Sequence, residues 1–118
     1  MTIRRKQKIS KELITLIPQV PYLDSQCIYT AATRTSMKYL PPSIAVWLAT
    51  IAHIRHQHTE YDNLLCEGYD RDSALFFVFD AINKTLIEWG ANRLLKREEN
   101  TNDINITSVP LKTNSFNV

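Results

Sequence analysis

The clearest hydrophobic pattern in the chain lies in its last third and is typical of an amphipathic helix. Apolar side chains recur there at the spacing of one helix face: Leu75, Val78, Phe79, Ile82, Leu86 and Trp89. Asp70 is a suitable N-cap before this stretch, and Gly90 can end the helix behind it. We therefore predict a long helix over residues 71–89 with this stripe in the core. Phe76 and Phe77 widen its apolar surface, and we expect them either to lie under the first helix or to form a partner surface.

Two helices are expected near the N-terminus. The first is short, over residues 10–17, because Ser10 can cap it and Pro18 disfavours the helical conformation in the residue before it. The second covers residues 24–38, with Asp24 as its cap.

A third helix and a short connecting helix complete the set. The third begins after two consecutive prolines, which fit a first helical turn, and ends near residue 58. Its expected apolar face consists of Ile44, Trp47, Leu48 and Ile51. Thr59 and Asp62 are spaced like a capping box for a short helix over residues 60–67, which Gly68 can end. The sequence has few glycines and little of the alternation of apolar and polar residues that is typical of strands. It therefore predicts an all-α, compact bundle of about four helices and this connecting helix.

The length of 118 residues is that of one domain. We expect a basic N-terminal arm over residues 1–9, a helical domain over 10–97 and a flexible, asparagine-rich C-terminal tail over 98–118. Cys27 and Cys66 share no metal or redox spacing, and two lone thiols suit a reducing cytoplasm. No apolar run approaches the roughly 18 residues of a membrane span, so we expect a cytoplasmic protein without a membrane segment.

The net charge of +2 is unevenly distributed. The first eleven residues hold five basic side chains and no acid, whereas the remainder holds nine basic residues and twelve acids. These five are Arg4, Arg5, Lys6, Lys8 and Lys11. Such a segment is either a contact for nucleic acid or a membrane surface, or a solvated tail.

All three histidines lie within residues 52–74, together with two arginines and five acids. On a continuous helix His53 and His56 share a face and could reach one ion, whereas His58 points elsewhere unless the helix breaks. A metal site would need a further ligand from a distant segment, and no spacing identifies one, so we predict no metal. His58 could instead be oriented by Asp62 for base catalysis, or could satisfy the backbone where two helices meet.

Arg55 borders the apolar face of the third helix and should meet a carboxylate. Three acids are its candidate partners: Asp62, Asp70 and Asp80. We predict one polar network of Arg55, Tyr61 and Asp62 that holds the helices together. The alternative is an anion site that Arg55 shares with Arg71 at the start of the last helix.

A broader pattern runs through this region: Ala52, His53, Arg55, His56, His58, Thr59, Tyr61, Asp62, Leu64 and Leu65, then Gly68, Arg71, Asp72, Ala74, Leu86 and Trp89. This pattern resembles a family known only as a domain of unknown function, numbered twenty-two ninety-three. The resemblance covers about residues 41–90 and implies no activity, because none is established for the family.

The leading interpretation is a small cytoplasmic helical binding module, whose partner is another protein or a second copy of the chain. A nucleic-acid-binding protein that uses Arg4, Arg5, Lys6 and Lys8 is the first alternative, and a small metal- or histidine-dependent enzyme is the second. We predict no cofactor and no catalytic residue. The candidate functional or structural cluster is Arg55, His56, His58, Thr59, Tyr61, Asp62 and Arg71.

Overall fold

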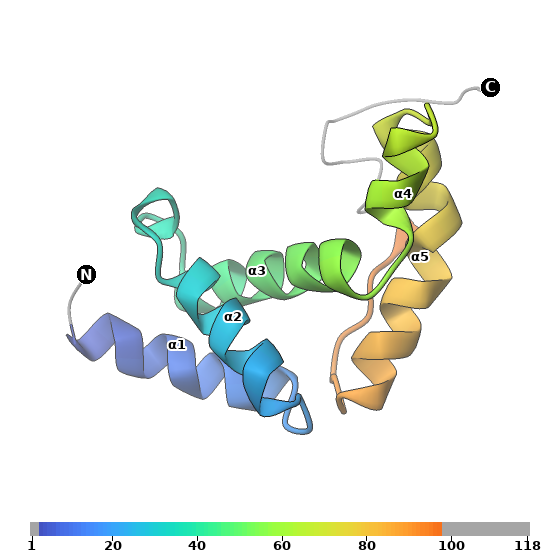
Figure 1. Ribbon diagram of the computed structural model, residues 1–118. Helices are drawn as coiled ribbons and strands as arrows, with labels where there is room; N and C mark the ends of the chain where they lie inside the picture. Colours follow the sequence, from blue (N-terminus) through green and yellow to red (C-terminus); the bar gives the residue numbers. More distant parts are fainter. Residues whose placement is uncertain (1–2, 98–118) are drawn as a thin grey trace.

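The computed structural model describes residues 3–97, and this part of the chain is helical and contains no strand (Figure 1). The all-α prediction is therefore confirmed. The elements are α1 (Ile3–Leu16), α2 (Tyr22–Ala32), the 3-10 turn η1 (Thr35–Met37), α3 (Pro42–Gln57), α4 (Tyr61–Cys66) and α5 (Arg71–Glu88). The expected C-terminal tail, residues 98–118, lies outside the described residues.

Helix α3 is the central element of this arrangement. Helices α1 and α2 pack against α3 and against each other, while α4 packs against α5, and both of these also contact α3. Figure 1 shows α4 and α5 beside the C-terminal end of α3, on the far side from η1. The end of α3 is therefore where the two groups of helices meet.

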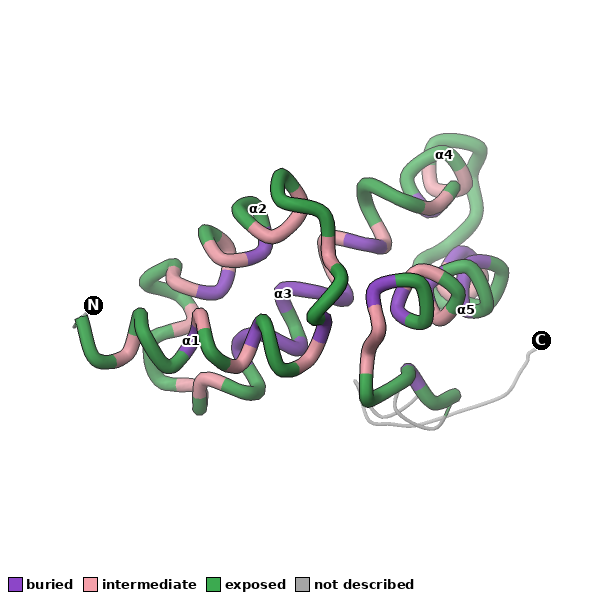
Figure 2. The backbone as a smooth tube through the Cα atoms, turned by 90° about the horizontal axis from the view of Figure 1, so that it is seen from below, coloured by how far each residue is buried: buried purple, intermediate pink, exposed green. Residues whose placement is uncertain are grey.

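The core follows from this central position of α3. Figure 2 shows buried positions gathered along α3. Seven of its residues are buried: Ala45, Val46, Trp47, Ala49, Thr50, Ile51 and Ile54. The expected face of α3 is partly wrong, because Ile44 and Leu48 are 43% and 45% exposed. A helix covered from several sides buries more than one stripe, so a single-face reading of its sequence misplaces some positions.

Helix α1 begins at Ile3, so the predicted start at residue 10 is wrong. Arginine, lysine and glutamine are good helix formers, and the basic residues extend the helix toward the N-terminus. Ile9 and Leu13 are buried and anchor this helix to the core, and Ile17, just after the helix, is buried at the same four-residue spacing. The guanidinium of Arg5 donates to the carbonyl oxygen of Met37 at 2.8 Å, which ties α1 to η1.

Helix α2 is shorter than expected and starts two residues earlier, after Pro21 as its N-cap. Asp24 therefore lies within the first turn and is not the cap that the sequence suggested. The helix ends at Ala32, where the Thr33 hydroxyl donates to the carbonyl oxygen of Tyr29 at 3.0 Å. Because Asp24 does not cap its own helix, its carboxylate is available to another element.

Helix α5 agrees closely with the prediction. The carboxylate of Asp70 accepts a hydrogen bond from the backbone N–H of Ser73 at 2.8 Å, and Gly90 takes a φ of +78° just after the helix. The predicted stripe is buried except for Leu75, which is half-buried. Phe76 and Phe77 are 61% and 59% exposed, so the first of their two alternatives, burial under the first helix, is wrong.

Candidate functional site

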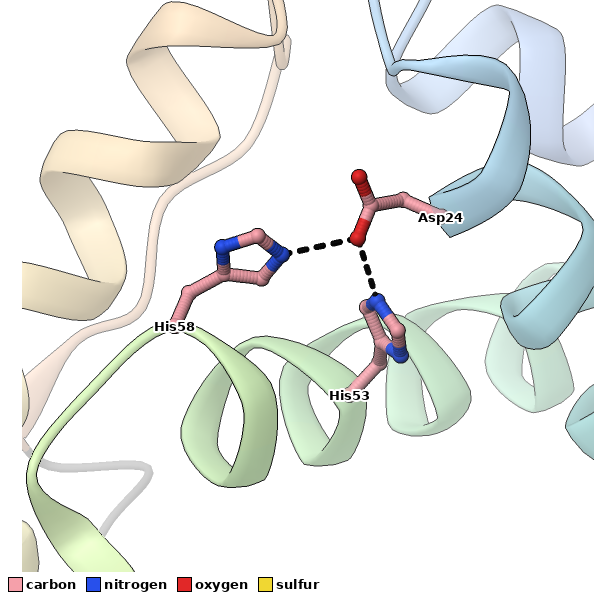
Figure 3. A group of neighbouring side chains, drawn as sticks. All are labelled: Asp24, His53 and His58. Atoms are coloured by element: carbon pink, nitrogen blue, oxygen red, sulfur yellow. Dashed lines mark hydrogen bonds and ion pairs between the residues drawn. The ribbon is translucent and has the colours of Figure 1, made fainter.

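Two histidines converge on one carboxylate where α2 meets the end of α3. The Oδ1 atom of Asp24 lies 2.7 Å from Nε2 of His53 and 2.7 Å from Nε2 of His58. Figure 3 shows the two rings approaching this oxygen from different directions. We refer to these three residues as the Asp24–His53–His58 cluster.

The end of α3 brings the two histidines together. Five residues along a continuous helix correspond to a rotation of about 140°, which would point the two side chains apart. His58 follows the last helical residue, and its backbone turns to φ −127° and ψ 10° while its N–H still bonds to Ile54. The change in backbone direction allows His58 to reach the same carboxylate as His53.

The cluster is shielded on one side and open on the other. His53 and Asp24 side chains are 11% and 18% exposed, whereas His58 is 35% exposed. The indole of Trp89, just after α5, lies edge-on to the His58 ring with centroids 5.4 Å apart. The cluster therefore joins α2, α3 and the end of α5.

Opposing effects act on the Asp24 carboxyl. Burial raises the pKa of Asp24, whereas the hydrogen bonds from His53 and His58 and their charge lower it, and the net result is a pKa below its ordinary value. Asp24 is therefore ionised at neutral pH and can hold a positive partner or accept two N–H donors.

A surface hollow of about 630 Å³ opens beside the cluster between α2 and α3. All three cluster residues line it, as do Cys27 and His56. The cluster is thus reachable from solvent and is part of a concave surface.

His56 belongs to a separate pair. Its Nδ1 lies 2.8 Å from Oδ1 of Asp62, and its ring meets the Tyr61 ring edge-on at 5.5 Å between centroids. Both partners are about half exposed, so the pair is a surface contact of small energetic value. The shared face of His53 and His56 that the sequence suggested therefore does not bring these two rings to one point.

Arg55 does not form the ion pair that we expected. Its guanidinium carbon lies 5.2 Å from the centroid of the Tyr61 ring, and its buried Nε has no hydrogen-bond partner among residues 3–97. The three proposed acids are engaged elsewhere: Asp62 with His56, Asp70 with the backbone of Ser73, and Asp80 with Arg97. The predicted network of Arg55, Tyr61 and Asp62 is therefore wrong in its central link, because the Asp62 side chain bonds to His56 and forms no ion pair with Arg55.

Thr59 connects the end of α3 to the start of α4. Its hydroxyl donates to the carbonyl oxygen of Arg55 and accepts from the backbone N–H of Tyr61 at 3.2 Å. The predicted capping box of Thr59 and Asp62 is wrong, because α4 begins at Tyr61 with Glu60 as its N-cap and the Asp62 side chain bonds to His56. Arg71 is exposed at the first position of α5 and belongs to neither histidine group.

The basic residues near the N-terminus lie on a folded helix. Arg4, Lys6 and Lys8 are exposed on α1, whereas Arg5 is partly buried against η1. Arg4, Lys8 and Lys11 follow one another at four- and three-residue spacing, so they share a stripe on the side opposite the buried Ile9.

Asp24 is the member of the Asp24–His53–His58 cluster that the sequence analysis did not predict. It lies 29 residues before His53, and its position before an apolar stretch suggested a helix cap. No spacing in the sequence connects it to the histidines, because the packing of α2 on α3 makes the connection.

The fold and this site define a class: a small all-α domain with a histidine-rich junction at the end of its central helix. A family model described as an uncharacterized conserved protein, DUF2293, matches residues 12–90, and the chain belongs to this family. No curated protein and no solved structure matches the chain. The whole Asp24–His53–His58 cluster falls within the matched range, whereas Arg4, Lys8 and Lys11 precede it. Among the described residues, no helix is both long enough and apolar enough to cross a membrane.

Proposed function

We propose that the protein is a small helical binding module and that its cationic end binds the backbone of a nucleic acid. The observation that carries this proposal is the solvent-facing stripe of Arg4, Lys8 and Lys11 on α1. At 1.5 Å rise per residue the stripe spans about 10 Å, and it contains no acidic residue. Cations fixed on a folded helix bind phosphates with a smaller entropy loss than cations on a mobile tail.

The distribution of charge along the chain also favours an anionic ligand at the end formed by α1 and η1. Over residues 3–50 there are seven basic residues, Arg4, Arg5, Lys6, Lys8, Lys11, Arg34 and Lys38, against two acids, Glu12 and Asp24. Arg34 and Lys38 flank η1, which the hydrogen bond from Arg5 holds beside α1. Over residues 51–97 six basic residues face seven acids, so the excess of positive charge belongs to the α1–η1 end.

An exposed aromatic ring favours a single-stranded ligand. Tyr39 is 88% exposed, and the Lys38 ammonium lies 5.0 Å from the centre of its ring. Proteins that bind single strands combine cationic tracks for the backbone with aromatic rings on which bases stack. Tyr39 and the α1 stripe provide both elements at one end of the fold.

The test compares two variants that lose the same charge. Arg4→Gln/Lys8→Gln/Lys11→Gln removes the stripe, and Arg71→Gln/Lys84→Gln/Lys96→Gln removes three exposed cations from the rest of the domain. Binding to a fluorescent single-stranded oligonucleotide is measured by anisotropy at several salt concentrations, and circular dichroism checks the fold. Each lost phosphate contact should reduce the magnitude of the log–log salt slope by about 0.7, so the stripe variant should lose about two. Equal behaviour of the two variants, or no binding by the parent, would refute the proposal.

A protein partner is the second candidate, and it rests on a different surface. Phe76 and Phe77 are exposed on α5, and the Phe77 ring stacks edge-on with Tyr69 at 5.5 Å between centroids. Exposed aromatic groups of this kind favour contacts with other proteins or a second copy of the chain.

Two exposed free cysteines, Cys27 and Cys66, support our proposal of a reducing cytoplasmic location.

A further inference from the structure

We propose that Asp24, His53 and His58 bind one divalent transition-metal ion, with zinc as the representative ion. The ligand atoms are Nε2 of each histidine and a carboxylate oxygen of Asp24. This site shares no residue with the cationic stripe on α1 and lies within the part of the chain that the family model matches.

The geometry brings the three ligand atoms to one point. One ligand atom from each residue lies within 4.8 Å of the other two, and both nitrogens are 2.7 Å from Oδ1. Zinc binds histidine nitrogen and carboxylate oxygen at about 2.0–2.2 Å, which places tetrahedral ligands about 3.3 Å apart. Each nitrogen–oxygen separation must therefore increase by about 0.6 Å, a change that small rotations of the side chains can provide.

The two rings share one oxygen of Asp24. A carboxylate has two oxygens and could receive one imidazole on each, but both histidines approach Oδ1 (Figure 3). His56 provides the contrast within the same helix, because it faces a carboxylate of its own, Asp62. Two imidazole nitrogens that converge on one carboxylate oxygen bring three potential ligand atoms together, as a metal ion requires.

The donor set and the surroundings select the class of ion. Imidazole nitrogens suit zinc and neighbouring transition metals, whereas calcium and magnesium prefer oxygen ligands throughout. Three protein ligands leave a fourth tetrahedral position open, as in catalytic zinc sites. The hollow between α2 and α3 gives water or a small ligand access to that position.

Bound metal should also stabilise the fold, because the ligands come from different elements. Asp24 belongs to the first turn of α2, His53 to α3 and His58 to the connection toward α4, with Trp89 packed against His58. An ion that binds the folded chain in preference to the unfolded chain raises the melting temperature with its concentration.

The experiment uses the full chain after removal of metal with a chelator. Zinc binding is measured by isothermal titration calorimetry, and the bound metal is counted by elemental analysis after dialysis. We expect one zinc ion per chain. Asp24→Asn and His58→Ala should each weaken binding by about a hundredfold or more, because loss of even an outer-shell partner commonly costs 10- to 100-fold.

His56→Ala is the matched control, since it removes a neighbouring histidine that also lines the hollow. The control should bind zinc as the parent does. Asp24→Asn keeps the size of the side chain, and circular dichroism together with the metal-free melting temperature reports whether each variant folds. Absence of stoichiometric zinc in the parent, or equal loss in His56→Ala and His58→Ala, would overturn the proposal.

Discussion

The substitution Ile82→Ala tests whether the buried face of α5 is the one described above. Ile82 is fully buried in the middle of α5, where it belongs to the common core with Val78 and Leu86. The substitution removes three carbon groups, worth about 2.4 kcal/mol at roughly 0.8 kcal/mol each. A residual cavity adds to this loss, so the free energy of unfolding should fall by about 2–5 kcal/mol.

The same helix contains a matched control. Ile87 is 62% exposed, so Ile87→Ala makes the same chemical change without removing core contacts. Its effect should stay within about 0.5 kcal/mol. Denaturant unfolding followed by circular dichroism measures both values. For a domain of this size, even a loss of about 2 kcal/mol for Ile82→Ala corresponds to a fall in melting temperature of about 8–16 °C.

Similar losses for the two alanine variants would show that Ile82 is not in a packed core. A loss near zero for Ile82→Ala would mean that α5 presents another face to α3 or is not packed against it. Either result would contradict the arrangement in which α5 closes the core over the end of α3.

Two smaller effects follow from the polar contacts. Asp70→Ala should cost about 1 kcal/mol at pH 7, because Asp70 caps α5 through Ser73. Hydrogen bonds from Ser73 lower the pKa of Asp70 in the folded chain. The stabilisation is therefore fully present when the pH is above the ordinary pKa of an aspartate, and it is lost as the pH falls through the lowered pKa of the folded state. Urea unfolding of parent and variant at neutral and strongly acidic pH should show the difference shrinking in acid, and a constant difference would contradict the role of charge. Tyr61→Phe should change stability by less than about 0.5 kcal/mol, because the hydroxyl makes no hydrogen bond within residues 3–97. A loss near 1 kcal/mol in the same assay would point to a hydrogen bond.

The fold could be predicted where one helix buries one face. In α5 the buried apolar positions form a single stripe between a capping aspartate and a glycine, so the hydrophobic pattern and the signals for the two helix ends agree. Helix α3 is packed by neighbours on several sides, and its sequence carries apolar residues around much of its circumference. The buried positions of α3 therefore cannot be predicted from apolar spacing alone, and the predicted face includes Ile44 and Leu48, which are 43% and 45% exposed.

The start of α1 shows a different limit. A run of basic residues without acids suggests a solvated tail, although the same residues have high helix propensity. Buried Ile9 decides between these outcomes, because it gives the basic segment a contact with the core. One apolar residue within a charged run was too weak a signal to predict the two additional turns.

The candidate site could be predicted only in part, for reasons of geometry. The density of histidines marked the correct region, but a helical projection assumes that the helix continues through His58. The helix ends at Gln57, so the two histidines that share a partner are His53 and His58, and not His53 and His56 as a continuous helix would allow. The third member, Asp24, depends on how α2 packs on α3, which no local spacing encodes.

The family match separates the two proposals. The matched range of 12–90 contains Asp24, His53 and His58 but none of the cations of the α1 stripe. The match therefore covers the proposed metal site and does not reach the residues proposed to bind nucleic acid. The stripe variant should accordingly leave zinc binding unchanged, and His58→Ala should leave oligonucleotide binding unchanged, because the altered side chains belong to different elements and share no contact among the described residues. Loss of both activities in either variant would show that the two ends of the domain do not act independently.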